Sequence, residues 1–387
     1  MNNKERVRNI LERKPVDYLP TNIEFSDMTR GKELCAALEV PEGQTLDEYL
    51  DNCFYMTFVE DDLPIFFRND DQMMLDLEKK GFCYVDLENE LVYSRMGYGM
   101  VMHHDSIVPV YGPLEADAEK DRTAGRVLPE RFTRLFGLPV EERVRKFEMP
   151  DPWVEGGLDY MKADFARFDE SGKYCMLPAG YWGVYETSHI LMGWEQLMLE
   201  IALRPNMIHE LIEKVTDYKV ELAKRKLKEC PHFLYHQSDD VATQLAGNFS
   251  LSMFREMILP YFRRVFEVYR NAGCHVCFHS CGMIMDYIPD IIDAGADMLE
   301  PIQTVNDLAT LKREYGQDLV FWGGIEVQKL SFWTPEETSA ETKRVIHTLG
   351  KGGGLIIAPS QHLTNEVPIA NIKALIKTAR EERDKVF

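Results

Sequence analysis

The sequence predicts an α/β protein that folds as a single (β/α)8 TIM barrel over residues 1–387. Short β-branched and aromatic runs alternate with longer helical stretches, which is typical of parallel strands joined by right-handed crossovers. Eight such strand-like runs can be counted along the chain, the number that a barrel of this type requires. An open doubly wound sheet is the weaker alternative, because no Gly-x-Gly-x-x-Gly follows the first run.

The predicted elements begin with a helix over 3–13, which ends at Lys14-Pro15, and a first strand near 18–25. The second strand lies either in 53–59 or in 63–67, and both options stay open. Further strands are predicted at 174–178, 232–236, 274–279, 296–299, 319–322 and 354–358. Helices are predicted at 31–39, 45–52, 154–168, 184–202, 205–229, 251–272, 284–294, 305–315, 335–349 and 368–384.

Residues 82–152 interrupt this alternation and are predicted to form a β-rich cap inserted into the barrel. Alternating apolar residues between 82 and 111 indicate β-hairpins. The rest of the segment is charged and rich in turn-forming residues, with a short helical piece expected near 129–146.

Composition excludes several classes of protein. Asp and Glu number 64 against 44 Lys and Arg, a net charge of −20, which argues against a general nucleic-acid binder. No run of about 18 apolar residues is present, so no membrane span is expected. The eight cysteines are scattered and no signal peptide opens the sequence, so we expect reduced thiols in a cytoplasmic protein.

The clearest functional signal lies in 273–303. His279 and Cys281 stand where the predicted strand 274–279 ends, and because they are two residues apart they share one side of it. An imidazole and a thiolate suit zinc. Glu300 ends the next strand, which strengthens the case for a metal site, whereas Cys274 and Cys277 are interpreted as packing residues.

Other polar or aromatic residues also follow predicted strands, and in a barrel they would meet at one mouth. Asp239 and Asp240 could orient a substrate or share a proton, although an acidic turn before a helix is the plain alternative. Tyr181 and Trp182 could form the wall of an aromatic pocket or only pack. Substrate binding is also expected of Glu24 near the end of the first strand, although a solvated loop carboxylate is the alternative there. The other candidates are His236, Gln303 and Gln361 for substrate binding, Glu326 for catalysis and His362 for metal binding.

Several longer motifs stand out along the chain. They are His279-Ser280-Cys281-Gly282, Phe321-Trp322-Gly323-Gly324 and Gly353 to Pro359, with an Asp239-Asp240 strand exit before a Phe249-Ser250 helix start. With these motifs the chain resembles the uroporphyrinogen decarboxylase superfamily, which has a (β/α)8 fold. The decarboxylase branch fits poorly, because its N-terminal Arg-rich motif is absent here. The corrinoid-dependent methyltransferases of the superfamily fit better.

The resemblance implies zinc held by His279, Cys281 and Glu300, with a fourth ligand near the eighth strand. Gln361 falls in that fourth position, but the adjacent His362 is the better zinc ligand. We therefore expect His362 to bind the metal and Gln361 to hydrogen-bond substrate or support the metal site. An ether-cleaving pattern in this group also matches Glu326, Glu341 and His362, although Glu341 is expected mid-helix; Glu326 is expected as a ligand or pocket acid.

The function that follows is an anaerobic O-demethylase component. It would take a methyl group from a methoxylated substrate, for which an aromatic compound is expected, and pass it to the Co(I) of a partner corrinoid protein. The alternatives are transfer from a methylcorrinoid to a thiol, a cofactor-free decarboxylase, and a non-catalytic scaffold for the corrinoid protein.

Overall fold

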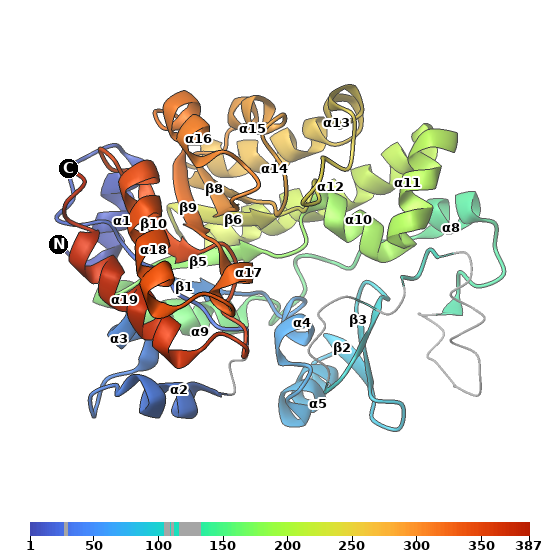
Figure 1. Ribbon diagram of the computed structural model, residues 1–387. Coiled ribbons are helices and arrows are strands. Elements are labelled where there is room, and N and C mark those ends of the chain that lie inside the picture. Colours follow the sequence, from blue (N-terminus) through green and yellow to red (C-terminus); the bar gives the residue numbers. More distant parts are fainter. Residues whose placement is uncertain (27–29, 104–108, 110–111, 116–132) are drawn as a thin grey trace.

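A computed structural model describes residues 1–387 except 27–29, 104–108, 110–111 and 116–132. Its main sheet is parallel, and its seven strands follow one another in sequence order (Figure 1). The strands are β1 (Phe54–Thr57), β5 (Cys175–Gly180), β6 (Leu234–Ser238), β7 (His275–His279), β8 (Met298–Ile302), β9 (Val320–Ile325) and β10 (Leu355–Pro359).

Residues 20–23 close this sheet into a barrel. Thr21 forms parallel bridges with Asn52 beside β1 and with Ile357 in β10. The backbone N–H of Asn22 donates to Ile357 O at 3.0 Å, and the Ile357 N–H donates to Pro20 O at 2.9 Å. The first predicted strand therefore supplies the eighth member, and the predicted (β/α)8 class is confirmed. Of the two options for the second strand, β1 lies within 53–59, whereas 63–67 forms helix α4 (Leu63–Phe67).

Most predicted helices occur close to their expected bounds and pack around the barrel (Figure 1). They are α1 (Asn3–Leu11), α2 (Gly31–Leu38), α3 (Leu46–Leu50), α9 (Asp159–Phe168), α12 (Pro205–Glu229), α15 (Ile288–Ala294), α16 (Leu308–Tyr315), α18 (Pro335–Leu349) and α19 (Ile369–Glu382). Two short helices, α5 (Asp71–Lys79) and α17 (Val327–Leu330), were not predicted.

Two helices predicted as continuous are each broken once. The stretch 184–202 forms α10 (Val184–Met192) and α11 (Trp194–Leu203), because Gly193 between them has φ 84°, outside the helical region. The stretch 251–272 forms α13 (Leu251–Met257) and α14 (Leu259–Asn271), with Pro260 in the first turn of α14, where its missing N–H is tolerated.

A small antiparallel sheet lies beside the barrel, at the lower right of Figure 1. It contains β2 (Cys83–Asp86), β3 (Leu91–Ser94) and β4 (Gly99–Val101), as expected for hairpins in this stretch. The end of the stretch predicted to form hairpins, at 104–108 and 110–111, lies outside the described residues. The helix expected near 129–146 is represented by α8 (Val140–Lys146), and 129–132 also fall outside them.

Strand β7 shows how the sequence orients the site. Phe278 packs outward against α14, with its ring centroid 5.4 Å from that of Phe262 and 6.2 Å from that of Phe266. Such a fully buried aromatic side chain contributes about 1.5–3 kcal/mol relative to an exposed one. Because side chains alternate along a strand, this packing turns the neighbouring His279 toward the barrel interior.

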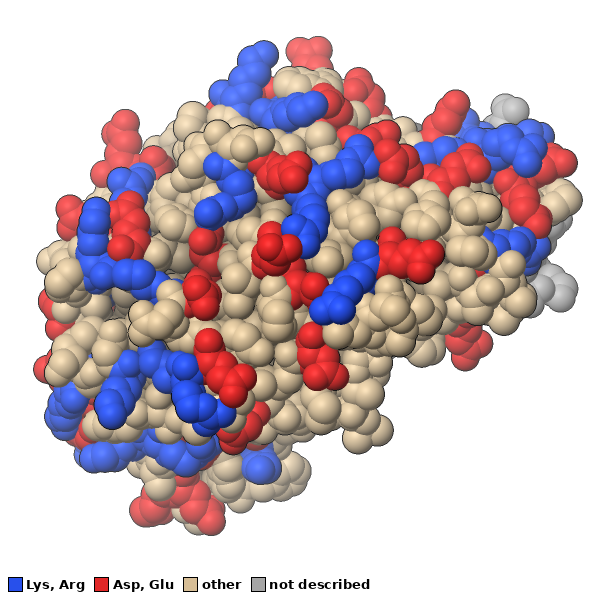
Figure 2. Space-filling model, turned by 90° about the horizontal axis from the view of Figure 1, so that it is seen from above, with Lys and Arg blue, Asp and Glu red and all other residues tan. Residues whose placement is uncertain are grey.

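The surface carries both signs of charge. Figure 2 looks down on the helices at the top of Figure 1 and shows acidic and basic side chains interspersed. Some of these charges form ion pairs between helices: Arg264 on α14 pairs with Glu213 on α12 at 2.7 Å and with Asp217 at 2.5 Å. No helix in the described part of the chain has the length and apolar character needed to cross a membrane.

Candidate functional site

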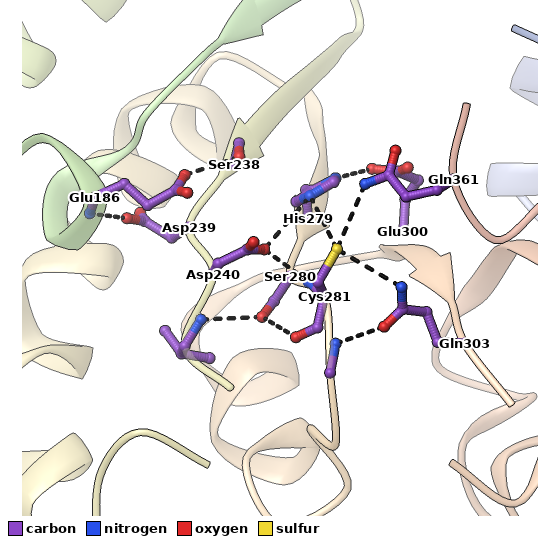
Figure 3. A network of polar contacts seen from close by, with 12 residues as sticks. Glu186, Ser238, Asp239, Asp240, His279, Ser280, Cys281, Glu300, Gln303 and Gln361 are labelled. Atoms are coloured by element: carbon purple, nitrogen blue, oxygen red, sulfur yellow. Dashed lines mark hydrogen bonds and ion pairs between the residues drawn. The ribbon is translucent and has the colours of Figure 1, made fainter. Parts of the chain in front are cut away.

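His279 is at the centre of a polar cluster at the carboxyl ends of the strands (Figure 3). Its Nε2 lies 4.0 Å from Cys281 Sγ and 3.5 Å from Asp240 Oδ1. The backbone N–H of Cys281 donates to the same Asp240 oxygen at 2.7 Å, which fixes that carboxylate. One nitrogen, one sulfur and one oxygen donor thus lie within 4.8 Å of one another, close enough to share a metal ion.

Glu300 lies on the opposite side of the imidazole. Its Oε2 forms a short hydrogen bond with His279 Nδ1 and lies 3.1 Å from His236 Nε2. Burial raises the Glu300 pKa, but the two imidazoles lower it more, so the pKa lies well below its usual range. A carboxylate that holds the outer nitrogen of a histidine fixes which ring nitrogen faces a metal. Here Glu300 directs Nε2 toward Cys281 and Asp240.

A second donor cluster contains His236, His279 and Glu300. His236 is only 3% exposed, and its Nδ1 has no hydrogen-bond partner among the described residues. Its ring centroid lies 5.7 Å from that of His279. His236 is expected from the sequence to bind substrate, and in the structure its imidazole contacts the Glu300 carboxylate.

Two amide side chains surround the Cys281 sulfur. Gln361 Nε2 donates to Sγ at 3.4 Å, and Gln303 Nε2 donates to it at 3.7 Å. Gln303 is held by its oxygen, which accepts from the Gly282 N–H at 2.7 Å. Both residues expected at the mouth from the sequence are therefore beside the predicted zinc ligand.

His362, the expected fourth ligand, lies elsewhere. Its Nε2 is 3.1 Å from Glu24 Oε2, and its side chain is 53% exposed. Neither donor cluster found among the described residues includes it. Of the two adjacent loop residues, Gln361 contacts the Cys281 sulfur, whereas His362 contacts Glu24.

The acidic pair after β6 divides into two environments. Asp239 is fully buried and accepts hydrogen bonds from the backbone N–H groups of Val184 at 2.9 Å and Glu186 at 2.8 Å. It therefore holds the start of α10, and burial raises its pKa to about 6. The Asp240 side chain is 41% exposed at the mouth. Burial raises the Asp240 pKa, but His279 lowers it more, so its carboxyl stays ionised.

Glu326 follows β9 and has local partners. It is the N-cap residue of α17, accepting from the Gln328 N–H at 3.3 Å, and the Thr304 hydroxyl donates to its other oxygen. Glu341, from the ether-cleaving pattern, lies within α18 and pairs with Arg344 at 2.7 Å. Neither glutamate belongs to a donor cluster in the described part of the chain.

Aromatic side chains form a wall next to the polar cluster. Tyr181 follows β5, and its ring centroid is 4.8 Å from that of Phe66, which stacks on Phe58 at 3.9 Å. Trp182 is mostly buried and packs edge-on against Tyr98 at 5.2 Å. Burial raises the Tyr181 pKa above its ordinary value, and nearby acidic groups including Asp240 add to the rise. Tyr181 thus lies between the aromatic wall and the cluster of Asp240, His279 and Cys281.

Glu186 is a site residue that the sequence did not suggest. It lies in the first turn of α10, is 9% exposed, and accepts a hydrogen bond from the Ser238 hydroxyl at 2.9 Å (Figure 3). Burial raises its pKa to about 8, and the charges of Asp240 and Asp239 add to the rise. The candidate residues were expected where strands end, whereas Glu186 follows a turn. Its position as the first charged residue after Tyr181-Trp182-Gly183 could have drawn attention to it.

Comparison with known proteins identifies the family to which the chain belongs. The family model described as uroporphyrinogen decarboxylase (URO-D) matches residues 139–382, so the chain belongs to that family. No curated protein sequence matches.

Two solved structures are similar to this chain at low sequence identity. A methyltransferase from Methanosarcina mazei is similar over 98% of this chain and 99% of its own, with 15% identity and a TM-score of 0.56. A B12-independent methionine synthase from Shewanella sp. W3-18-1 has 13% identity and a TM-score of 0.41 over 57% of this chain and 67% of its own.

Proposed function

We propose that the protein is a zinc-dependent methyltransferase. It demethylates a methoxylated aromatic substrate and passes the methyl group to the Co(I) centre of a partner corrinoid protein. The observation that carries this proposal is the Asp240–His279–Cys281 cluster beside the aromatic wall of Phe58, Phe66 and Tyr181. Membership of the uroporphyrinogen decarboxylase family is compatible with it, and the fold-level likeness to a methyltransferase supports it.

The donor set suits zinc. Imidazole nitrogen, thiolate sulfur and carboxylate oxygen are its usual protein ligands, and three such ligands leave a position for substrate. We assign these roles to His279, Cys281 and Asp240. Glu300, expected from the sequence as a ligand, is better placed to hold His279 through Nδ1. Zinc bound there would act as a Lewis acid toward the ether oxygen.

The residues of the chain would bind and orient the substrate. The Phe58, Phe66 and Tyr181 rings offer an apolar surface for an aryl ring. Gln303 and Gln361 are fixed next to the sulfur and can hydrogen-bond substituents. Because the attacking atom belongs to the corrinoid protein, no side chain here needs to act as a nucleophile.

Metal analysis tests the proposed site and separates the alternatives. The isolated protein is expected to bind one zinc ion, and the His279→Ala/Cys281→Ala double variant to bind none while keeping its circular dichroism spectrum. The matched control is Cys277→Ala, which removes a buried thiol from the same strand. Full zinc content in the double variant, or none in the wild type after zinc addition, would favour the decarboxylase or scaffold alternative.

A further inference from the structure

The Cys281 sulfur lies between two side-chain amides that come from different strand ends (Figure 3). Gln303 follows β8 and donates to Sγ at 3.7 Å, and Gln361 lies just beyond β10 and donates to it at 3.4 Å. His279 Nε2 lies 4.0 Å from the same sulfur. The sulfur therefore accepts hydrogen bonds from two segments that are distant in sequence.

The orientation of both amides is fixed at their oxygen ends. Gln303 Oε1 accepts from the backbone N–H of Gly282 at 2.7 Å and from Gln244 Nε2 at 2.6 Å. Gln361 Oε1 accepts from the backbone N–H of His362 at 3.1 Å. Because a backbone N–H can only donate, the oxygen of each amide must face it, and the NH2 group is left to face the sulfur. Gln303 is also only 6% exposed, so burial holds its arrangement in place.

The number of donors matches the electron pairs of a metal-bound thiolate. A thiolate sulfur carries three lone pairs, and one of them would be used in the bond to zinc at the site assigned to Asp240, His279 and Cys281. The two amide N–H groups correspond to the two pairs that remain. A hydrogen bond to an ionised acceptor is roughly twice as strong as one between neutral groups, and it makes the electrons of the acceptor less available for a new bond.

The proposed substrate carries a methyl group that a cysteine thiolate can capture. Thiolates are strong nucleophiles, and the thiolate is also the form of cysteine that binds metals. If Cys281 reacted, a sulfur lone pair would form the bond to the methyl carbon, and the oxygen would leave as phenolate with the electrons of the broken bond. The methylated sulfur would have lost its negative charge and its affinity for zinc, so a single such event would inactivate the protein.

We propose that Gln303 and Gln361 are positioning residues that hold the Cys281 sulfur as a metal ligand and keep it from accepting the methyl group. This inference rests on the proposed function. It adds a reason for the two amides to lie against the sulfur: the strongest nucleophile that this chain brings to the site is occupied by hydrogen bonds, and the methyl group is left for the Co(I) of the partner.

Methyl iodide tests this protection in the zinc-loaded protein without corrinoid or substrate. Peptide mass spectrometry follows S-methylation of Cys281, with Cys35, a half-buried free cysteine on α2, as the internal reference. Gln361→Leu and Gln303→Leu should each raise the ratio of Cys281 to Cys35 methylation about 10-fold or more, because each removes a hydrogen bond to a charged sulfur. Gln328→Leu makes the same change at an exposed position in α17 and should match wild type.

The spectrum of protein in which cobalt(II) replaces zinc separates hydrogen bonding from simple access to the sulfur. Loss of an N–H donor raises the energy of the sulfur electrons, so the sulfur-to-cobalt charge-transfer band should move to longer wavelength in Gln361→Leu and Gln303→Leu, but not in Gln328→Leu. Gln361→Leu is the primary variant, because Gln361 is half-buried on a loop.

An unmoved band in Gln361→Leu, or a methylation ratio equal to that of wild type, would overturn the assignment. A wild-type protein that binds cobalt(II) without any sulfur-to-cobalt band would give a different result. It would refute the metal site on which the proposed function depends, and the inference would fall with it.

Discussion

At the residue scale, the two nitrogens of His279 have different tasks. Nδ1 is hydrogen-bonded to Glu300, and Nε2 faces Cys281 and Asp240. The sequence placed His279, Cys281 and Asp240 correctly at or just after the ends of β7 and β6. Glu300 was expected to follow its strand but lies within β8, which continues to Ile302. The sequence could not separate a metal ligand from the carboxylate that holds one, because both are acidic residues near strand ends.

This division of roles predicts different effects on zinc binding. Asp240→Asn removes a ligand and should lower zinc affinity more than Glu300→Gln, which should lower it about 10–100-fold. Zinc titration with a competing chelator measures both. A larger loss in Glu300→Gln would restore Glu300 as the direct ligand.

The adjacent residues Gln361 and His362 give a second prediction. The sequence favoured His362 as a zinc ligand. In the structure His362 contacts Glu24, and Gln361 contacts Cys281, so Gln361 is expected to affect zinc affinity more than His362. Gln361→Ala should lower zinc affinity several-fold, and His362→Ala should leave it unchanged. A strong loss of zinc in His362→Ala alone would support the original expectation, with the loop rotated in the zinc-bound protein.

The raised pKa of Glu186 also predicts a pH effect on stability. Between about pH 4.5 and pH 8 the unfolded chain has released this proton and the folded protein has kept it, so Glu186 lowers stability as pH rises. Glu186→Gln removes this effect. Its free energy of unfolding relative to wild type should be higher at pH 9 than at pH 5 by about 1–2 kcal/mol or more. Urea titrations at both pH values would show this, and a pH-independent difference would contradict it.

At the element scale, the connection from β5 to α10 organises the mouth. A Cβ atom added at Gly183 would lie 1.9 Å from Asp239 Oδ2, so only glycine fits where that carboxylate binds the first N–H groups of α10. The sequence identified the strand, the turn and the helix. It missed the break at Gly193 because a single glycine within a helical pattern is often tolerated.

Gly183→Ala is expected to destabilise the protein by about 1–3 kcal/mol, because the added methyl group must displace Asp239. Chemical denaturation measures the change. Gly31→Ala is the control, since a Cβ atom at Gly31 meets nothing within 4 Å and the residue lies in the first turn of α2. Equal stability of both variants would show that the Asp239 contact with α10 is not tight.

At the scale of the whole molecule, barrel closure brings distant segments to one mouth. Thr21 joins β1 to β10, so Glu24 meets His362 across 338 positions of sequence. The count of eight strand-like runs was sufficient to predict this architecture. Glu186 could not be predicted in the same way, because its place in the site depends on a contact between a helix and the neighbouring strand that strand-end patterns do not encode.

The reaction proposed for this protein is methyl transfer from an aryl ether to a reduced corrinoid. The most direct measurement is the visible spectrum of a Co(I) corrinoid protein mixed with the zinc-loaded enzyme and a methoxyarene, with the phenol product quantified. We expect one phenol for each corrinoid converted, and no conversion with the His279→Ala/Cys281→Ala variant. Methyl transfer from a methylcorrinoid to a thiol, without any reaction of the methoxyarene, would contradict this reaction, as would phenol formation that survives in the double variant.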